Sequence, residues 1–599
     1  MLLNRPKPSI PEGKTLCVDT ETTGLMYRHG DRPYLFTFAN LQGETGLFYY
    51  DVDPTTRRVQ YKKKELNKLR ALFSDPTMTF WAHNAQFDRN MIEAALGIKT
   101  KCIWKCTMNL IRTVKSDAPL KLKEFCAKHL GISNADEEAL RKEVQRRRGR
   151  GKVLGWKLGE VLETDYWMAP TECMKYGVFD ALRVMAIINT LSPEVVGGLK
   201  DVLKYEEQLW PIMREVEDHG VHIDRAKTLE LRDRYQKKSV YYSLIFKVHA
   251  PTVNPRSHPQ LKKLLYETYN EPVIYSTKSK LPATDYYALK GMKNPCAKAL
   301  LEMRACNKTV DAMEEYLHYM VQHEDGGWYI HPNFNQAIPV TGRESCTGPN
   351  LQNVASGESS KETEVKAEAR TVFGPPPDYV WRSYDWKNIE VFIPAFASGE
   401  PELVQILRAG GDVHQNTADS LRITRLVAKR VFFGLLYGIG GELLAKQLGI
   451  SVSRCWQIIN NFKEKYATMS EWMDELKTTA LNDGYITTPF GRRQQIDPDK
   501  AYRAVNYDIQ GTAADILKRS KIRIHTALKQ TGLDAHIILP IHDEVLLQVR
   551  KGVSLQRVDD LVVRCMQENP ELNMPVRIPV SISAITTNWH EKQKVRLAA

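Results

Sequence analysis

The sequence contains few cysteines and no long apolar run, and both absences restrict what the protein can be. Its 10 cysteines include no CxxC pair, so we expect no zinc site. No stretch reaches the roughly 18 consecutive apolar residues of a membrane-spanning helix, and the opening residues lack the apolar core of a signal peptide. We therefore expect no membrane partner, a reducing cytoplasmic compartment, and free, mostly buried thiols.

Length and charge indicate a multi-domain protein with a polyanionic partner. A chain of 599 residues is too long for one hydrophobic core, so about two to four domains are expected. The chain carries 84 Lys+Arg against 71 Asp+Glu, a net charge of +13. This balance suits nucleic acid, because each neutralised phosphate releases counterions, but many basic proteins bind none.

Changes in periodicity, rather than repeats or low-complexity segments, divide the chain. The first part predicts an α/β domain, with strands at 15–18, 34–39 and 46–50 and helices at 63–73 and 88–96. A Ser-Pro step and a Gly pair within 191–198 mark a boundary.

The rest of the chain predicts a helical arm and then a large α+β domain. Long helical patterns cover 201–319, with breaks at 254–260 and 276–284, and strands and helices mix from Trp328 onward. The basic run from Arg141 to Lys152 interrupts the first domain. It predicts a loop, and two interpretations remain open: a solvated loop and a loop that contacts phosphates.

Four acidic residues of the first domain are placed where they can face one another. Asp19 and Glu21, in VDTETTGL, stand two apart on a strand and so point to one side. Asp88 follows HNAQF at a helix start, and Asp180 lies four residues after Tyr176 on one helical face. Taken singly, Asp88 could be a helix cap and Asp180 a surface charge. Together they supply the oxygen ligands that a pair of hard divalent ions requires.

These three motifs, in this order over roughly residues 14 to 192, resemble the DEDD exonuclease family in its tyrosine-bearing subclass. The resemblance implies that the four carboxylates ligate two Mg²⁺ or Mn²⁺ ions. It implies that Tyr176 orients the water that attacks the 3′-terminal phosphodiester. It also implies that Asn84 and Phe87 hold the frayed, single-stranded end of the DNA.

Two further acidic residues stand far apart in the last third of the chain. Asp385 follows the strand-like WRSY and precedes the helical NIEVFIPAFASG. Asp543 interrupts the apolar run IILPIHDEVLLQV, which predicts a β-hairpin with a charged tip. The HDE triplet alone favours an ordinary polar hairpin turn. Next to a neighbouring strand end, however, an acid at such a tip can help to hold two metals about 3.5–4 Å apart.

Between these acids, Arg425, Lys429, Phe433 and Tyr437 recur at every fourth residue in TRLVAKRVFFGLLYGIG. Each step of four drifts by only about 40°, so the four residues form one slowly turning helical stripe. Two cations followed by two aromatic rings suit a nucleoside triphosphate. The alternative is an ordinary amphipathic helix with some exposed charge.

Residues 200 to 599 resemble the A family of DNA polymerases, which contains bacterial DNA polymerase I and several phage replicases. Five ordered segments carry the resemblance: TGRESCTGPNLQN, YDWKNIE, the Arg425–Tyr437 stripe, NYDIQGTAAD and IHDE. The implied fold is a ribonuclease H-like exonuclease domain (1–195) followed by a right-hand polymerase. Its thumb would span 196–325 and its palm and fingers 326–599, with the fingers at about 400–500.

The resemblance also implies roles for individual residues. Asp385 and Asp543 would hold two Mg²⁺ ions, and Lys429 would donate a proton to pyrophosphate. The nucleotide site would comprise Arg425, Lys429, Phe433, Tyr437, Glu390 and His542. The DNA contacts would comprise Arg343, Asn350, Asn353, Asn506, Gln510 and Glu544. Glu390 and Tyr437 would exclude a ribose 2′-hydroxyl, and Phe433 implies discrimination against dideoxynucleotides. Trp386–Asn388, Phe392 and Tyr502 depart from the family pattern, which leaves the primer-strand contacts open.

The expected protein is therefore a DNA-directed DNA polymerase with a proofreading 3′–5′ exonuclease. We expect a monomeric, phage-type replicative enzyme in the host cytoplasm that uses primer–template DNA and dNTPs. A helicase or primase and a single-strand-binding protein are expected as further partners. The alternatives are a repair or gap-filling polymerase of a cell or organelle, a DNA-binding exonuclease with an inactive polymerase half, and a single-subunit RNA polymerase.

Overall fold

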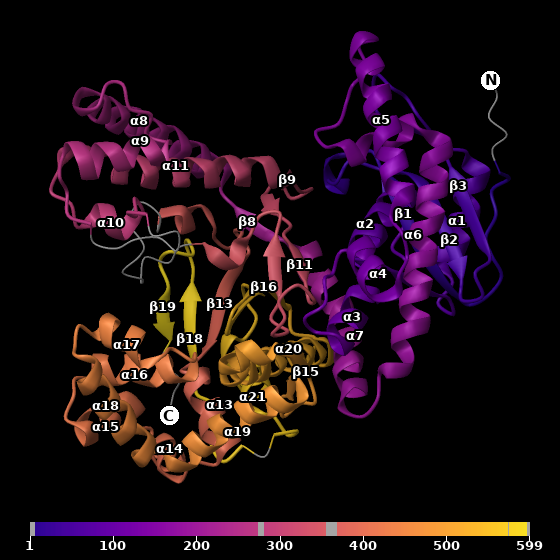
Figure 1. The fold of residues 1–599 in the computed structure, drawn as a ribbon. Coiled ribbons are helices and arrows are strands. Elements are labelled where there is room, and N and C mark those ends of the chain that lie inside the picture. The colour runs from indigo at the N-terminus through magenta and orange to yellow at the C-terminus, as the bar shows by residue number, and fades with distance from the viewer. Residues whose placement is uncertain (1–5, 274–280, 355–367, 573, 596–599) are drawn as a thin grey trace.

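The computed structural model describes residues 6–273, 281–354, 368–572 and 574–595. Figure 1 shows an N-terminal α/β unit beside a larger body, with the long helix α7 (Gly198–His219) between them. No helix among the described residues is both long and apolar enough to cross a membrane. Part of the break expected at 276–284 lies outside the described residues.

The N-terminal unit is built on a five-stranded sheet of order β3-β2-β1-β6-β7. The central strand β1 runs antiparallel to β2 and parallel to β6. The strands are β1 (Thr15–Thr22), β2 (Pro33–Asn40), β3 (Thr45–Tyr49), β6 (Thr79–Ala82) and β7 (Ile103–Cys106), with a separate pair β4 (Asp51–Val52) and β5 (Val59–Gln60).

Helices cover both faces of this sheet because successive residues of a strand point to opposite sides. Leu16 and Val18 of β1 pack with α1 and α2, whereas Cys17 packs with α3, α4 and α6. The helices are α1 (Lys63–Ser74), α2 (Ala85–Leu96), α3 (Thr107–Val114), α4 (Leu122–Leu130), α5 (Ala135–Val153) and α6 (Pro170–Leu191). The loop expected at the basic run from Arg141 to Lys152 is wrong, because this run lies within α5.

The helical arm that follows is dominated by α8 (Arg225–His249) and α11 (Pro295–Tyr319), which pack lengthwise against each other (Figure 1). Its smaller helices are α9 (His258–Lys262), a π-helical turn (Lys263–Thr268) and α10 (Tyr286–Lys290). A small sheet of order β8-β10-β9 lies at its base, formed by β8 (Val221–Ile223), β9 (Met320–Gln322) and β10 (Trp328–Ile330).

The C-terminal part is centred on an antiparallel sheet of order β16-β17-β13-β18-β19. Its strands are β13 (Tyr379–Trp386), β16 (Ala535–Ile541), β17 (Glu544–Arg550), β18 (Val580–Ile585) and β19 (Gln593–Val595). The associated helices are α13 (Ile389–Ser398), α20 (Ala504–Thr531) and α21 (Leu555–Gln567). The hairpin predicted around Asp543 is therefore confirmed.

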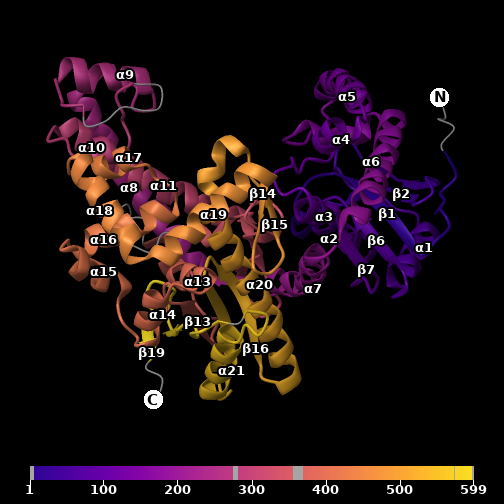
Figure 2. The same cartoon turned by 60° about the horizontal axis from the view of Figure 1, so that its bottom comes forward.

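A helical subdomain is inserted between α13 and α20 (Figure 2). It comprises α14 (Pro401–Arg408), α15 (Val413–Leu421), α16 (Arg425–Leu436), α17 (Gly441–Leu448), α18 (Val452–Lys465) and α19 (Ala467–Asp483). The short pairs β11 (Asn333–Asn335) with β12 (Ser345–Thr347) and β14 (Tyr485–Thr487) with β15 (Arg493–Gln495) complete the strands. Short 3₁₀ turns lie at Tyr27–His29, Leu162–Met168, Ser192–Glu194, Leu351–Asn353, Glu368–Val372 and Pro498–Arg503.

Candidate active sites

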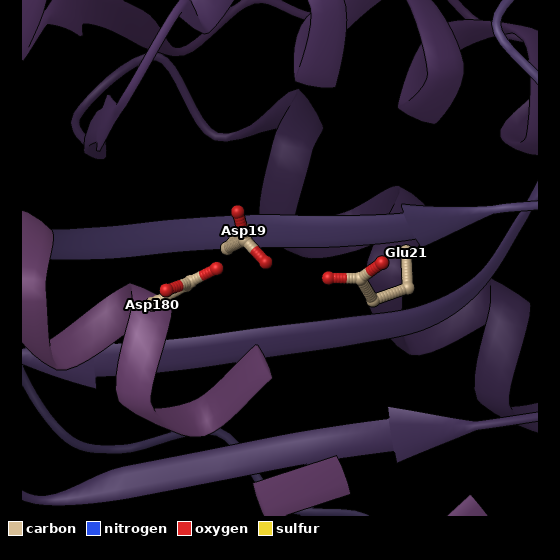
Figure 3. A group of neighbouring side chains, drawn as sticks. All are labelled: Asp19, Glu21 and Asp180. Atoms are coloured by element: carbon tan, nitrogen blue, oxygen red, sulfur yellow. The ribbon is translucent and has the colours of Figure 1, made fainter. Parts of the chain in front are cut away.

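Three carboxylates of the N-terminal unit converge on one point, with their ligand atoms within 4.8 Å of one another. Asp19 and Glu21 share the face of β1 that carries Cys17, and α6 covers this face and supplies Asp180 (Figure 3). The alternation of the strand and the packing of α6 therefore create the cluster.

This cluster is electrostatically unfavourable without a cation. Burial, with the repulsion of Asp180 added, raises the pKa of both Asp19 and Glu21 well above the usual range. The Oδ2 atom of Asp19 is buried and has no hydrogen-bond partner among the described residues. A bound divalent cation would relieve the repulsion and bind this free oxygen, so the residues present fit a metal centre.

Asp88 lies beside the cluster rather than within it. It sits in the first turn of α2, on the opposite face of the sheet from α6, and accepts a hydrogen bond of 2.7 Å from the Thr20 hydroxyl. Burial raises the pKa of Asp88 to about 7, and its charge in turn raises the pKa of Asp19 and Glu21. The structure thus brings Asp19, Glu21 and Asp180 together with Asp88 next to them, and ligation by Asp88 stays a prediction.

Tyr176 is linked to the same cluster by Lys123, a residue that the sequence did not predict to be part of the site. The Lys123 ammonium donates a hydrogen bond of 3.0 Å to Asp180 Oδ2 and another to the Tyr176 hydroxyl. Burial alone would lower the pKa of Lys123, but Asp180 raises it above the usual value. Lys123 stands in LKLKEF, which shows only the start of an amphipathic helix, so no local signal marks it.

Asn84 and Phe87 border a cavity between the N-terminal unit and the rest of the protein. The cavity has a volume of about 440 Å³, and its other walls include Tyr27, Tyr319 and Asn335. Asn84 is exposed and adopts a left-handed backbone (φ 61°) directly before α2. Both predicted residues therefore line one open cavity, and their contact with DNA stays a prediction.

The second pair of acids is brought together by the central C-terminal sheet. Asp385 of β13 pairs with Glu544 of β17, and the Trp386 amide donates a hydrogen bond of 3.3 Å to the Asp543 carbonyl. Asp543 occupies the tip of the β16–β17 hairpin beside His542, whose φ is 51°. The two acids thus lie at neighbouring strand ends, as the sequence predicted.

Burial, with the charge of Glu390 added, raises the pKa of Asp543, so this site also fits a shared cation. The sequence did not predict a further charged residue near this site, Lys592. The Lys592 ammonium and the Ser383 hydroxyl each donate a hydrogen bond of 2.6 Å to Glu544 Oε1. Lys592 stands directly before β19, a strand of three residues that is too short to be predicted from its pattern.

The predicted stripe of four residues lies on α16 and its C-terminal cap. Arg425, Lys429 and Tyr437 are exposed. Lys429 Nζ lies 5.9 Å from the centre of the Phe433 ring, which stacks on Tyr437 at 5.9 Å between ring centres. Arg425 is held by Asp412 through an ion pair of 2.7 Å. Cations and aromatic rings therefore share one accessible surface.

Glu390 joins three of the predicted segments. Its carboxylate accepts a hydrogen bond of 2.6 Å from the Tyr437 hydroxyl and one of 3.2 Å from Arg343. A cavity of about 30 Å³ continues this site, and Arg343, His542 and Asp543 are among its walls. The structure therefore gathers Arg343, Glu390 and His542, which are widely separated in sequence, near Asp543.

The remaining residues predicted to contact DNA occupy accessible positions. Asn350 and Asn353 are exposed at the 3₁₀ turn Leu351–Asn353. Gln510 and Asn506 lie one turn apart on α20, where the Gln510 amide donates a hydrogen bond of 2.9 Å to Asn506. Their contacts with DNA stay predictions.

Comparisons with known proteins agree with this geometry. Residues 226–591 match the family model of DNA polymerase family A, and residues 8–196 match that of a 3′-5′ exonuclease. DNA polymerase I of Pseudomonas aeruginosa is 27% identical over 615 aligned residues, covering 97% of this chain and 64% of that protein. The thermostable DNA polymerase I of Thermus filiformis is 27% identical over 416 residues, covering 65% of this chain and 48% of that protein.

A solved structure shares the fold. The POL domain of Pol1 from M. smegmatis, in complex with DNA primer-template and dNTP, superposes with a TM-score of 0.74 at 22% identity and covers 96% of this chain and 95% of its own. The chain spans between about half and two thirds of the length of the curated relatives named above.

Proposed function

Because the chain belongs to DNA polymerase family A, we propose that it extends a primer 3′ end with dNTPs on a DNA template and excises mispaired ends with a 3′–5′ exonuclease. The observation that carries the proposal is the hydrogen bond of 2.6 Å between Tyr437 and Glu390. It joins the cationic and aromatic surface of α16 to the neighbourhood of Asp543. A triphosphate on α16 would thereby have its reacting end next to the acids.

In the polymerase site, each residue has a task that its position supports. Arg425 and Lys429 would bind the phosphates as charged donors, and Lys429 would pass a proton to the departing pyrophosphate. Phe433 would stack on the base, and Glu390 with Tyr437 would close over the C2′ position of the sugar. His542 and Glu544 would support the primer terminus, with Arg343, Asn350, Asn353, Asn506 and Gln510 on the duplex.

In the exonuclease site, Asp19, Glu21, Asp88 and Asp180 would hold two Mg²⁺ or Mn²⁺ ions, as Asp385 and Asp543 would in the polymerase site. Ions bound in this way supply an activated oxygen nucleophile and stabilise the leaving oxygen. Tyr176 would orient the attacking water, with Lys123 fixing its hydroxyl against Asp180. Asn84 and Phe87 would help to hold the unpaired terminal nucleotides.

The domain assignment proposed is an exonuclease domain (1–195), a thumb (196–325) and a palm with fingers (326–599, fingers about 400–500). We further propose a monomeric, phage-type replicative enzyme of the host cytoplasm that works with a helicase or primase and a single-strand-binding protein. A repair or gap-filling role is the alternative. An inactive polymerase half agrees less well with the structure, because Asp385 and Asp543 lie at neighbouring strand ends and the α16 cations are exposed.

Primer extension from a mismatched 3′ end tests both activities in one assay. Asp19→Ala/Glu21→Ala should abolish excision and keep synthesis, whereas Asp543→Asn should abolish synthesis and keep excision. Asp560→Asn, an exposed acid on α21, is the matched control and should change neither. Normal extension by Asp543→Asn would show that the assignment of the polymerase site is wrong.

A further inference from the structure

The basic run of the N-terminal unit forms an exposed row of cations on α5. This helix is anchored by Leu140 and Val144, which are buried against the segment Leu162–Met168 and α6. It carries seven Lys or Arg residues against four Asp or Glu residues, so its charge is strongly positive.

Part of this charge is used inside the protein. Arg148 forms an ion pair of 3.3 Å with the buried Asp165 and donates to the Gly159 carbonyl at 2.9 Å. Arg147 donates to the Met168 carbonyl at 2.6 Å, and Arg141 pairs with Glu163. These contacts explain three of the basic residues as structural.

A second group of basic residues faces solvent and forms no ion pair with another element of the described structure. Lys142, Arg146 and Arg150, which we call the α5 row, are exposed. Lys142 and Arg150 have no acidic partner among the described residues, and Arg146 pairs only with Glu143 of its own helix. The three stand four residues apart, so they follow one another at about 6 Å along the helix with a drift of about 40° per step. Like charges at this spacing disfavour an isolated helix, whereas a polyanion alongside would favour it.

The α5 row leads away from the exonuclease cluster. Glu137, at the start of α5, lies 4.0 Å from Lys123, which contacts Asp180. An open hollow of about 750 Å³ adjoins this point, and its walls include Lys121, Lys128 and Asn134. With a rise of about 1.5 Å per residue, the α5 row begins about 7 Å beyond Glu137 and ends about 20 Å beyond it. Figure 1 shows α5 reaching the outer end of the N-terminal unit.

We propose that the α5 row binds the sugar–phosphate backbone of the single-stranded DNA whose 3′ end lies in the exonuclease cluster. This inference rests on the proposed exonuclease function. The occupant is a single strand because the proposed exonuclease excises mispaired ends, whose terminal nucleotides are unpaired. Contacts from Lys and Arg to phosphate are independent of sequence, which suits an enzyme that must excise any mispaired end.

The test compares oligo-dT substrates of 4 and 12 nucleotides, because the longer strand alone reaches the whole row. The variant is Lys142→Ala/Arg146→Ala/Arg150→Ala in the full-length protein. The matched control is Lys63→Ala/Lys64→Ala/Lys68→Ala, which removes the same charge from exposed positions of α1 on the other face of the sheet. KM and kcat for excision are measured with Mg²⁺ at several salt concentrations. Excision kinetics report only on DNA whose 3′ end lies in the exonuclease cluster, because DNA bound elsewhere is not cut.

In the wild-type protein the KM should be lower for the 12-mer than for the 4-mer. The α5 variant should raise the KM for the 12-mer about tenfold at low salt and so reduce this difference between the two lengths, which we call the length advantage. It should also lower the magnitude of the slope of log(kcat/KM) against log[salt] by about 2, since three phosphate contacts are lost. The α1 control should keep the length advantage and the slope. The charge-retaining variant Lys142→Arg/Arg146→Lys/Arg150→Lys should also keep them.

Other results would overturn the inference in distinguishable ways. Equal effects of the α5 variant and the α1 control would show that the row makes no specific contact. Loss of the length advantage in the charge-retaining variant would show that charge is not the cause. A defect confined to the excision of fully paired 12-base-pair ends would identify duplex DNA as the occupant. If the wild-type protein excises neither oligonucleotide while Mg²⁺ is present, the proposed exonuclease function itself fails.

Discussion

The Tyr437 hydroxyl donates a hydrogen bond of 2.6 Å to Glu390, which links the end of α16 to α13. This pair would form a wall beside the C2′ position of an incoming nucleotide. Glu390→Ala should therefore raise the incorporation of ribonucleotides relative to deoxynucleotides by at least about tenfold, because a removed side chain no longer excludes a hydroxyl. Glu390→Gln keeps the volume and should keep most of the selectivity. The measurement is the ratio of kcat/KM for the two nucleotides, and an unchanged ratio in Glu390→Ala would contradict the assignment.

Phe433 should cause discrimination against dideoxynucleotides. Its ring is partly buried and stacks on Tyr437, and it offers no hydroxyl to replace a missing 3′-OH. Phe433→Tyr should reduce the discrimination by about tenfold, which corresponds to one added hydrogen bond. Phe433→Leu, which adds no hydroxyl, should leave it in place. Single-nucleotide insertion kinetics measure both, and equal use of ddNTPs and dNTPs by the wild-type protein would refute the prediction.

Local patterns predicted much of the two sites. The apolar run broken by His542 and Asp543 forms the expected hairpin, and the fourfold spacing from Arg425 forms the expected helix. The pattern placed Asp19 and Glu21 at the end of a strand that the structure extends to Thr22. Both carboxylates still share one face, since alternation does not depend on where the strand ends.

The predictions that failed did so because tertiary contacts, which local patterns do not show, decide the structure there. The basic run containing Gly149 and Gly151 has low helix propensity, and the prediction of a loop ignored the packing of Leu140 and Val144 that stabilises α5. Lys123 and Lys592 reach their acidic partners only through tertiary contacts, so nothing in their neighbouring residues marks them. Charged residues that reach a site from a distant segment therefore cannot be predicted from the pattern of their sequence neighbours.

Lys592 should weaken the binding of divalent ions in the polymerase site. Its ammonium lies 2.6 Å from Glu544, which pairs across the sheet with Asp385, and so reduces the negative potential there. Lys592→Met should lower the Mg²⁺ concentration needed for half-maximal synthesis about two- to fivefold, a modest effect because the pair is partly solvated. Lys594→Met is the control, since Lys594 is exposed on β19. A higher Mg²⁺ requirement in Lys592→Met alone would show that Lys592 instead positions Glu544.

The metal-free exonuclease cluster should make stability fall as pH rises. Burial raises the pKa of Asp88 to about 7, and the pKa values of Asp19 and Glu21 shift in the same direction. Between about pH 4, where these groups ionise in the unfolded chain, and about pH 7, the folded protein binds more protons. Its free energy of unfolding therefore decreases with pH across this window.

Thermal unfolding in EDTA from pH 5 to pH 8 checks this sign. Asp88→Asn cannot ionise at this position, so the Tm of the wild type should fall relative to the Tm of Asp88→Asn as pH rises. Added Mg²⁺ should reduce that shift, because a bound cation favours the ionised carboxylates. A difference that shifts toward the wild type with rising pH would contradict the burial of Asp88.

Arg492 should be essential for the junction between α7 and the C-terminal body. Its guanidinium is buried and lies 2.7 Å from both Glu206 of α7 and Asp515 of α20. Arg492→Met leaves these buried carboxylates with reduced compensation, since of the two only Glu206 is also paired with Lys518, and should destabilise the protein by about 3–5 kcal/mol. The neighbouring Arg493, whose guanidinium lies 4.5 Å from the Tyr485 ring, is only partly buried, so Arg493→Met should cost much less. Denaturant unfolding measures both, and equal losses would show that the junction does not depend on the buried charges.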